Sequence, residues 1–300
     1  MYIFFIFLLV AFIGGSNAAL VKLSVREFPP ALVVFLRFLF AAIIISPFVF
    51  RRRIVIEKKT KKYILLTGLT FAINILLFAV GIQYTSVIMS QIIYVPSGLL
   101  VAIIGFIFLK EKLSKNEVAG LILSLVGMAV LIQGSIKTQD TLSFGKPIGN
   151  VLIVVGLFSW SLYLVFSRKL SKTYSPLTIN FFSFTITLLL SLPFAIFEYS
   201  IRPFNLSQVT LSGILGLAGL VILSSIAFYF FYQWVIKYTS AFISSLVLYI
   251  IPIFAAVFGT LFFSEKLTTT LVLGSLLIFF GVFYAMSHQY VRKYLRSVLQ

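Results

Sequence analysis

Long apolar stretches alternate with short breaks of charged residues, glycine or proline along nearly the whole chain. The stretches run about 18 to 25 residues, the length that a helix needs to cross roughly 30 Å of hydrocarbon. They are continuously apolar and lack the period-two alternation of a membrane β-barrel. The pattern therefore predicts an all-α, polytopic membrane protein with ten transmembrane helices. The expected spans are residues 2–22, 31–50, 62–82, 86–109, 116–134, 147–167, 176–198, 208–235, 240–263 and 268–287.

A segment of the first half recurs in the second half. Tyr84–Leu113 and Tyr238–Leu267 are identical at ten of thirty positions at a constant offset of 154, including the closing Glu-Lys-Leu. The same offset pairs Gly120 with Gly274. With five spans in each unit, an odd number, the second unit enters the membrane inverted relative to the first, an arrangement typical of transporters. The predicted parts are a first repeat over 1–134, an external linker over 135–146, a second repeat over 147–287 and a basic tail over 288–300.

Composition agrees with a membrane protein and narrows the chemistry. The chain is 61% hydrophobic and 10% charged, too apolar to cover a soluble globule with polar surface. It has no cysteine, and its one histidine, His288, follows the last span. Disulfides and thiolate metal sites are therefore excluded, and we expect no metal and no cofactor.

The net charge of +17 comes from short loops rather than from a nucleic-acid-binding face. With the N-terminus inside, the cytoplasmic loops hold 17 Lys and Arg residues and the external loops hold 6. The positive-inside rule then places both termini in the cytoplasm of a cell membrane, with the basic loops against anionic headgroups. Residues Ser16-Asn17-Ala18 resemble a signal-peptide cleavage site, but no basic segment precedes the apolar run, so we expect the first span to be retained.

The chain also resembles a known family. FIGGSNAALVKL, LRFLFAA and LKEKL…GLILSLVGMAVL look like one EamA-type repeat, and LFSWSLYLVFSRKL and LFFSEKL…GSLLIFFGVFYAM look like a second. This resemblance to the ten-helix drug/metabolite transporter superfamily covers essentially all residues. It implies a helical bundle with a central path, as a monomer or homodimer, but no particular substrate. Two departures are Gly14-Gly15 where the family commonly has Trp-Gly, and Pro96, two residues out of register with Pro252.

Polar and aromatic residues in the middle of the spans are the candidates for a substrate pathway. An unpaired polar group in hydrocarbon costs several kcal/mol, so such side chains face protein or water. For each asparagine, a hydrogen bond between helices is the alternative. Pro96 and Pro252 are candidates for hinges or for simple kinks. The pathway candidates are Asn17, Asn74, Gln91, Tyr94, Trp160, Tyr163, Tyr229, Ser245 and Tyr249.

Charge within the spans limits the substrate. Arg37 is the only charge well inside a span, and both a structural and a functional role stay open for it. No acid is expected to be buried, because Glu27 and Glu198 lie at span ends and Glu111 and Glu265 lie at turns. A proton-coupled exporter of cationic drugs needs a buried carboxylate, and a phosphate carrier needs several buried cations. A small neutral or zwitterionic metabolite, such as an amino acid, fits better.

Other functions require residues that the sequence lacks. An intramembrane enzyme needs acid pairs, Ser/His dyads or metal ligands, whereas the one aspartate, Asp140, lies in a loop. ATP-driven transport needs a phosphate-binding loop, which is absent. A channel stays possible, and a lipid-linked sugar flippase of the same superfamily is the closer alternative. We expect an exporter or facilitator that works by alternating access, with the first, third and fourth spans facing the sixth, eighth and ninth.

Overall fold

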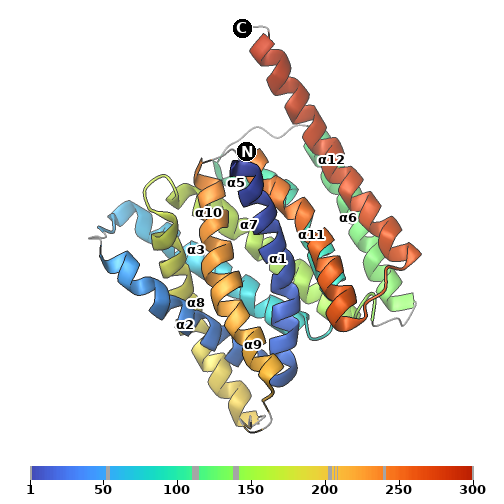
Figure 1. The fold of residues 1–300 in the computed structure, drawn as a ribbon. Helices are drawn as coiled ribbons and strands as arrows, with labels where there is room; N and C mark the ends of the chain where they lie inside the picture. The colour runs from blue at the N-terminus through green and yellow to red at the C-terminus, as the bar shows by residue number, and fades with distance from the viewer. Residues whose placement is uncertain are drawn as a thin grey trace.

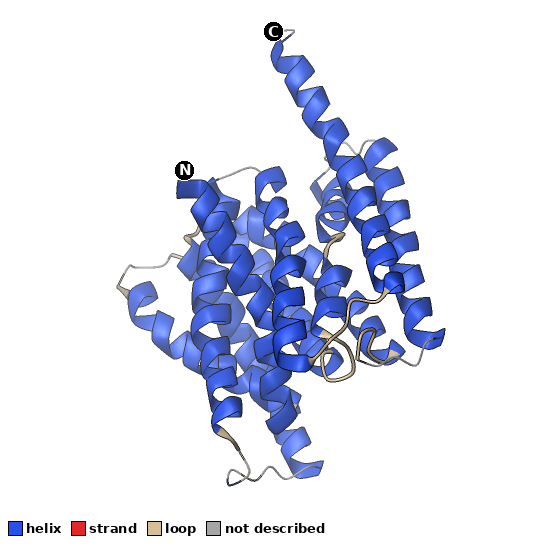
Figure 2. Ribbon diagram, turned by 45° about the vertical axis from the view of Figure 1, so that its right-hand side comes forward, coloured by secondary structure: helices blue, strands red, loops and turns tan. Residues whose placement is uncertain are grey.

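The computed structural model describes residues 2–51, 55–109, 115–137, 142–201, 205, 207, 209–238 and 241–298, and the regular elements in these ranges are helices (Figures 1 and 2). They are α1 (Tyr2–Glu27), α2 (Pro30–Phe50), α3 (Lys58–Gly81), α4 (Val87–Tyr94), α5 (Ser97–Leu109), α6 (Lys115–Lys137), α7 (Pro147–Leu170), α8 (Pro176–Ile201), α9 (Leu211–Gly219), the π-helix η2 (Leu220–Phe228), α10 (Tyr229–Tyr238), α11 (Ala241–Phe263) and α12 (Thr269–Val298).

The helices confirm the all-α membrane fold. Within the described ranges, seven helical segments are long and apolar enough to cross a membrane, and three shorter apolar helices span Val118–Gly134, Ile250–Phe263 and Thr269–Gly281. Each of the ten expected ranges coincides with one of these segments. These three segments belong to the longer helices α6, α11 and α12. The exact count of ten stays a prediction, because the apolar parts of these helices within the described residues are shorter than a full crossing needs.

Two of the expected spans are not regular α-helices. The fourth is divided into α4 and α5, which end and begin on either side of Val95 and Pro96. The eighth runs without a gap through α9, η2 and α10, so a π-helical segment lies in its middle. Proline lacks an N–H and cannot continue the hydrogen-bond ladder, which accounts for the first irregularity. The second has no such local cause in its sequence.

Helices from the two halves pack on each other rather than in separate bundles. α2 packs along α8, and α6 packs along α12. α1 lies against α11, whereas α7, its counterpart in the second half, lies against α4 and α5. Exchanging the halves therefore exchanges the packing partners as well, which is the pattern that an inverted repeat requires.

The α6–α12 pair depends on glycines that the repeat relates. A Cβ added at Gly127 would lie 2.9 Å from the carbonyl oxygen of Gly274, and one at Gly281 would lie 2.6 Å from that of Gly120. No side chain fits at such separations, so the two backbones touch directly, as small residues allow in membrane helices. This pair lies at one edge of the bundle, and α12 continues past its neighbours in Figure 1.

The predicted tail and linker both adjoin regular structure, and their boundaries stay predictions. α12 runs as one helix to Val298, so the backbone of the predicted basic tail is helical from 288 to 298. At the end of the linker, Ser143 and Phe144 are buried, and the Ser143 carbonyl accepts a 2.7 Å hydrogen bond from Ser86 Oγ. The last linker residues therefore pack into the bundle beside the start of α4.

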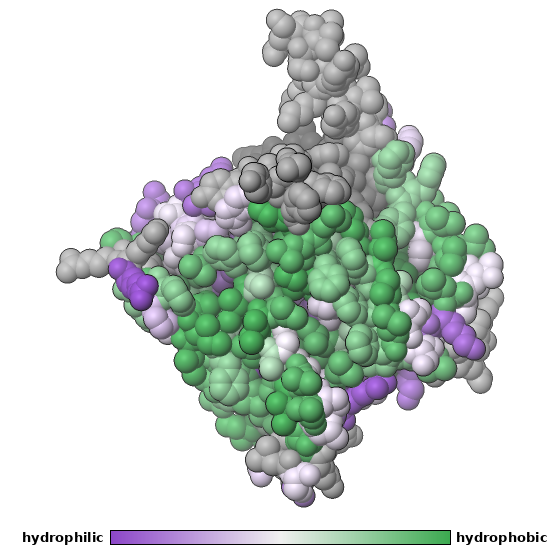
Figure 3. Space-filling view, in the orientation of Figure 1, coloured by the Kyte–Doolittle hydropathy of each residue, from purple (hydrophilic) through white to green (hydrophobic). Residues whose placement is uncertain are grey.

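The outer surface is apolar where lipid would contact it. Large aliphatic and aromatic side chains are exposed along most helices, including Phe194 and Phe197 on α8 and Leu215 on α9. Figure 3 shows a broad hydrophobic face with hydrophilic residues gathered near its margins. Membrane helices bury their polar groups and expose their apolar ones, so this distribution agrees with a bilayer as the solvent.

Candidate substrate cavity

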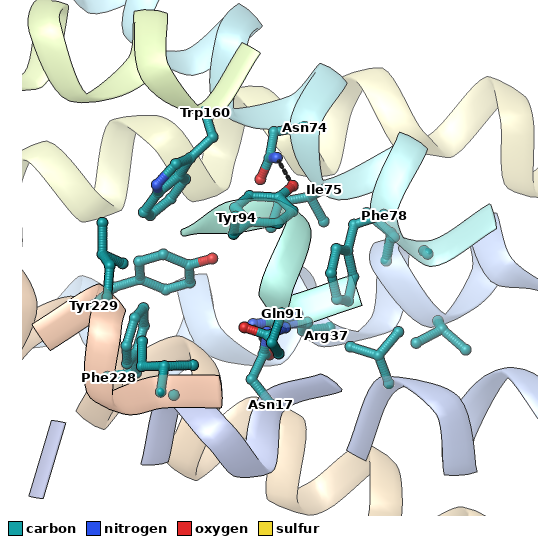
Figure 4. A pocket seen from close by; sticks show the side chains of 17 residues that line it. Asn17, Arg37, Asn74, Ile75, Phe78, Gln91, Tyr94, Trp160, Phe228 and Tyr229 are labelled. Carbon is teal, nitrogen blue, oxygen red and sulfur yellow. Dashed lines mark hydrogen bonds between the residues drawn. The ribbon is translucent and has the colours of Figure 1, made fainter. Parts of the chain in front are cut away.

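A cavity lies between the two halves of the chain (Figure 4). Residues of α1, α2, α3 and α4 line it from the first half, and residues of α7, η2, α10 and α11 line it from the second. The three expected helices of each half contribute, and α2 joins them. The polar and aromatic residues of its lining are Asn17, Arg37, Asn74, Phe78, Gln91, Tyr94, Trp160, Phe228 and Tyr229.

The cavity is narrow in this conformation. Its volume is about 60 Å³. That is room for a few water molecules, since one needs at least about 10–15 Å³ measured in the same way. Ligand pockets usually measure roughly 300–1,000 Å³. A ligand of the usual size would therefore fit only if helices or side chains of the two halves moved apart.

Arg37 of α2 is the charged residue of the cavity wall. It is 2% exposed, and its Nε donates a 2.7 Å hydrogen bond to Ser225 Oγ. Its Nη2 lies 3.4 Å from Asn17 Oδ1, and its guanidinium also interacts with the hydroxyl of Tyr229. These partners are all neutral. In the described part of the chain, the ion pairs are Lys22–Glu265 and Lys59–Glu57, so Arg37 has no described carboxylate partner.

The π-helix η2 presents two of the groups that surround Arg37. Ser225 lies within η2, Tyr229 follows directly after it, and both side chains are buried. A π-helix widens the turn by about one residue and often marks a functional site. Here it carries Ser225 to the Arg37 guanidinium while Phe228 and Tyr229 face the cavity. Sequence reasoning missed Ser225 and Phe228, because this segment reads as an ordinary apolar helix.

Asn74 connects three helices at the cavity. Its Nδ2 donates to the Tyr94 hydroxyl of α4 and, at 2.8 Å, to the carbonyl oxygen of Gly156 in α7. The interhelical hydrogen bond considered as the alternative for this asparagine is therefore present. Gln91 lies one turn before Tyr94, lines the cavity near Arg37 in Figure 4, and makes no hydrogen bond with another described residue.

Aromatic rings form the opposite wall. The Trp160 ring of α7 lies 5.1 Å from that of Tyr163 and 6.3 Å from that of Tyr229, measured between centroids. Trp160 Nε1 is buried and has no hydrogen-bond partner among the residues that the structure describes. Tyr163 is fully buried behind this wall, where its hydroxyl accepts a 2.8 Å bond from Gln233 Nε2. Tyr163 therefore supports the wall without lining the cavity.

The remaining candidates belong to α11 and to the proline positions. The side chains of Ser245 and Tyr249 lie outside the described residues, although Leu248 and Ile251 of the same helix line the cavity. Pro252 lies inside α11 without interrupting it. Pro96 lies at the break between α4 and α5, five residues after Gln91. The hinge role of both prolines stays a prediction.

The expectation that no acid is buried is wrong. Glu265 is 3% exposed, and its Oε1 accepts hydrogen bonds from Lys22 Nζ at 2.9 Å and from the Val87 N–H at 2.7 Å. Its Oε2 accepts from the Ile88 N–H at 3.0 Å. The turn after α11 folds back, with the Glu265 N–H bonded to the carbonyl of Gly259, and aims the carboxylate at the N-terminus of α4. This site is separate from the cavity, and no Asp or Glu occurs among the described residues that line the cavity.

Comparison with known proteins agrees with this architecture. The model of the EamA-like transporter family matches residues 1–133 and 147–287, so both halves match. An uncharacterized transporter of Archaeoglobus fulgidus is 24% identical over 94% of this chain and 96% of its own. The uncharacterized transporter YyaM of Bacillus subtilis is 29% identical, covering 93% and 92% of the two chains.

Two further similarities concern function and fold. A Salmonella typhimurium protein named "Probable amino-acid metabolite efflux pump" is 27% identical over 175 residues, which are 57% of this chain and 55% of that protein. A protein of known crystal structure is 16% identical and superposes with a TM-score of 0.62 over 95% of this chain and 96% of its own. At that identity the second similarity concerns the fold alone.

Proposed function

The chain belongs to the EamA-like transporter family, and we propose that it exports or facilitates the passage of a small neutral or zwitterionic metabolite, such as an amino acid, by alternating access. The observation that carries this proposal is the cavity between the halves, which residues of both repeats line with polar and aromatic groups. A site at the interface of two inverted repeats is exposed to either side when one repeat rocks against the other.

The chemistry of the cavity favours this substrate class. It offers one guanidinium, two asparagines and one glutamine beside five aromatic residues, a mixture suited to a small molecule with polar and apolar ends. A cation would find no counter-charge among the described lining residues. The relative named an amino-acid metabolite efflux pump supports the same class, although the similarity covers only 57% of this chain.

Alternating access also agrees with the irregular helices around the cavity. The break between α4 and α5 and the π-helix η2 leave backbone groups without their usual α-helical partners, which weakens these helices locally. Both irregularities lie beside lining residues, Gln91 and Tyr94 on one side and Phe228 on the other. The narrow cavity of this conformation is then an occluded state that opens when these segments shift.

We also propose that the protein resides in the cell membrane with both termini in the cytoplasm. The support is the 17-to-6 distribution of Lys and Arg between the two sets of loops. Because the chain has no cysteine, single cysteines introduced at Lys58 and at Lys146 can be labelled with an impermeant maleimide without a background. We expect labelling from outside at position 146 only. Labelling at position 58 in intact cells would reverse the orientation.

The transport activity itself is tested in reconstituted vesicles. Purified protein in proteoliposomes is loaded with unlabelled amino acids, nucleosides or sugars, and counterflow of each labelled compound is measured with and without a proton gradient. We expect saturable counterflow of at least one amino acid and none in protein-free vesicles. Movement of a lipid-linked sugar between leaflets, without counterflow of any soluble compound, would contradict the proposal and favour a flippase.

A further inference from the structure

The guanidinium of Arg37 is a buried charge with unused donors. Arginine has five N–H donors, and the described partners, Ser225, Asn17 and Tyr229, occupy at most three of them. Each partner is a neutral oxygen, and the contact with Asn17 is long at 3.4 Å. A buried charge that lacks an opposite charge is costly, and the cost falls when a carboxylate pairs with it.

Two further groups in the same cavity lack partners. Trp160 Nε1 is buried and bonds to nothing in the described part of the chain, and tryptophan normally finds a partner for this N–H when it is buried. The amide of Gln91 is likewise free of described partners and lines the same cavity as Arg37 (Figure 4). Three residues from three helices that line this one cavity therefore keep hydrogen-bonding groups without described partners.

The positions of these groups separate a polar end from an apolar end. In Figure 4, Arg37, Asn17 and Gln91 gather on one side, whereas Trp160, Tyr94 and the Tyr229 ring form the other, where the amide of Asn74 is already bonded to the Tyr94 hydroxyl. The guanidinium binds planar carboxylates through two parallel hydrogen bonds, and such charge-assisted bonds are about twice as strong as neutral ones. The rings suit an aromatic or aliphatic body.

We propose that Arg37 anchors a carboxylate of the transported molecule, with the body of that molecule against Trp160 and Tyr229. This inference rests on the proposed function. It restricts the substrate to small molecules with one carboxylate and an apolar or aromatic body, and it extends the class from zwitterionic amino acids to simple monocarboxylate anions. Because Arg37 is a single cation, it can neutralise one carboxylate of the bound molecule. Since no described acid lines the cavity, an α-ammonium group is not required for binding. Simple carboxylic acids therefore bind as well as the corresponding amino acids.

The test uses four probes that share one phenyl body. L-Phenylalanine and 3-phenylpropionate carry a carboxylate, whereas L-phenylalaninamide and phenethylamine do not. Propionate and propionamide form a smaller pair that suits the narrow cavity. Trp160 and Trp234 are the two tryptophans of the chain, so Trp234→Phe leaves Trp160 as the only indole reporter. Binding is followed by Trp160 fluorescence of the purified full chain in nanodiscs.

We expect saturable fluorescence changes with each carboxylate, and affinities at least about tenfold lower for the amides and the amine, since one charge-assisted hydrogen bond contributes roughly 1.5–3 kcal/mol. Arg37→Lys keeps the charge but loses the paired N–H donors that bind both oxygens of a carboxylate, and should weaken carboxylate binding about tenfold. Arg37→Gln should remove the preference for acid over amide. Arg51→Gln is the matched control, because Arg51 is an exposed arginine at the C-terminal end of the same helix.

Two results overturn the inference. The first is equal affinity of the unmutated protein for acid and amide, a comparison that needs no Arg37 variant to fold. The second is the absence of any response to all six probes at tens of millimolar. Counterflow separates the inference from the proposed function. If a neutral metabolite shows saturable transport that Arg37→Gln leaves unchanged, the proposed transport function stands and the role of Arg37 as a carboxylate site is wrong. Carboxylate binding without counterflow of any compound would support the carboxylate site at Arg37 and contradict the proposed transport function.

Discussion

Replacing Glu265 by glutamine tests whether the buried ion pair at the start of α4 stabilises the fold. The carboxylate accepts three hydrogen bonds, from Lys22 Nζ, the Val87 N–H and the Ile88 N–H, at 2.7–3.0 Å. The glutamine carbonyl can replace the oxygen shared by Lys22 and Val87. Its amide group then faces the Ile88 N–H, donor against donor, and Lys22 loses its counter-charge.

The expected cost follows from the burial of the pair. The Glu265 side chain is 1% exposed and that of Lys22 is 16% exposed. Removing one partner of a buried pair typically costs about 3–5 kcal/mol, and the partial exposure of Lys22 places this case near about 3 kcal/mol. For a chain of this size, that corresponds to a decrease in melting temperature of about 6–9 °C.

The assay is thermal unfolding of purified protein in one detergent, read from intrinsic fluorescence or from the loss of monodisperse protein. Lys22→Met combined with Glu265→Gln removes the stranded cation, so the double variant should recover part of the loss seen with Glu265→Gln alone. Glu57→Gln is the control, because the Lys59–Glu57 pair has side chains 81% and 40% exposed and should matter by about 0–1 kcal/mol. A melting temperature of Glu265→Gln within about 1 °C of the unmutated protein would refute the reasoning.

Asn74→Leu removes the hydrogen bonds to Tyr94 and to the Gly156 carbonyl, and should lower the melting temperature by several degrees while also slowing counterflow. An unchanged melting temperature and counterflow rate would mean that Asn74 does not hold α3, α4 and α7 together. Gly127→Leu places a side chain against the Gly274 carbonyl, where even a Cβ meets the oxygen at 2.9 Å, so we expect loss of folded protein in size-exclusion chromatography, whereas a normal yield would mean that α6 and α12 separate freely. Trp160→Phe keeps a ring but loses the unpartnered N–H, and should raise the KM of counterflow with little change in melting temperature; a stability loss without a KM change would assign Trp160 to packing.

The helices and their order could be predicted from hydropathy because a bilayer imposes one simple requirement. Each span must be about 20 apolar residues long and must form all of its backbone hydrogen bonds within the helix. A span can therefore be recognised from its local sequence. The repeat at offset 154 added the relation between halves, and the contact of Gly127 with Gly274 joins residues that this relation involves. Neither step needed knowledge of tertiary contacts.

Glu265 could not be placed in the same way. A charged residue in a turn is normally solvated, and the sequence near Glu265 contains nothing that contradicts this reading. Its burial depends on the free N–H groups of Val87 and Ile88, which precede it by 178 and 177 residues. The unsatisfied N-terminus of a membrane helix attracts a carboxylate, but which carboxylate reaches it is decided by packing. The recurrence of Glu-Lys-Leu was the only available signal.

The π-helix shows a second limit. Leu220–Phe228 is apolar apart from Ser224 and Ser225 and lacks proline, so helix propensity assigns it to a regular α-helix. The wider turn is compensated by contacts elsewhere, including the Arg37 bond to Ser225 from another helix. Pro96 and Pro252 show the converse, since similar local sequence accompanies a break in one helix and continuity in the other. Local chemistry permits the irregularity, and the surrounding helices decide whether it occurs.

The two halves repeat in backbone but differ in the cavity. An offset of 146 pairs Pro30 with Pro176 and Pro47 with Pro193 in α2 and α8. At this offset, Gly14 of α1 corresponds to Trp160 of α7, and Arg37 of α2 corresponds to Ser183 of α8. Gly14 and Trp160 both line the cavity, where one leaves space and the other fills it with a ring. The first half therefore supplies the charge and the second supplies most of the aromatic surface. A molecule with a carboxylate and an apolar body must contact both halves at once, so its binding energy depends on their separation. In the proposed mechanism, that dependence lets binding bias the motion of one repeat against the other.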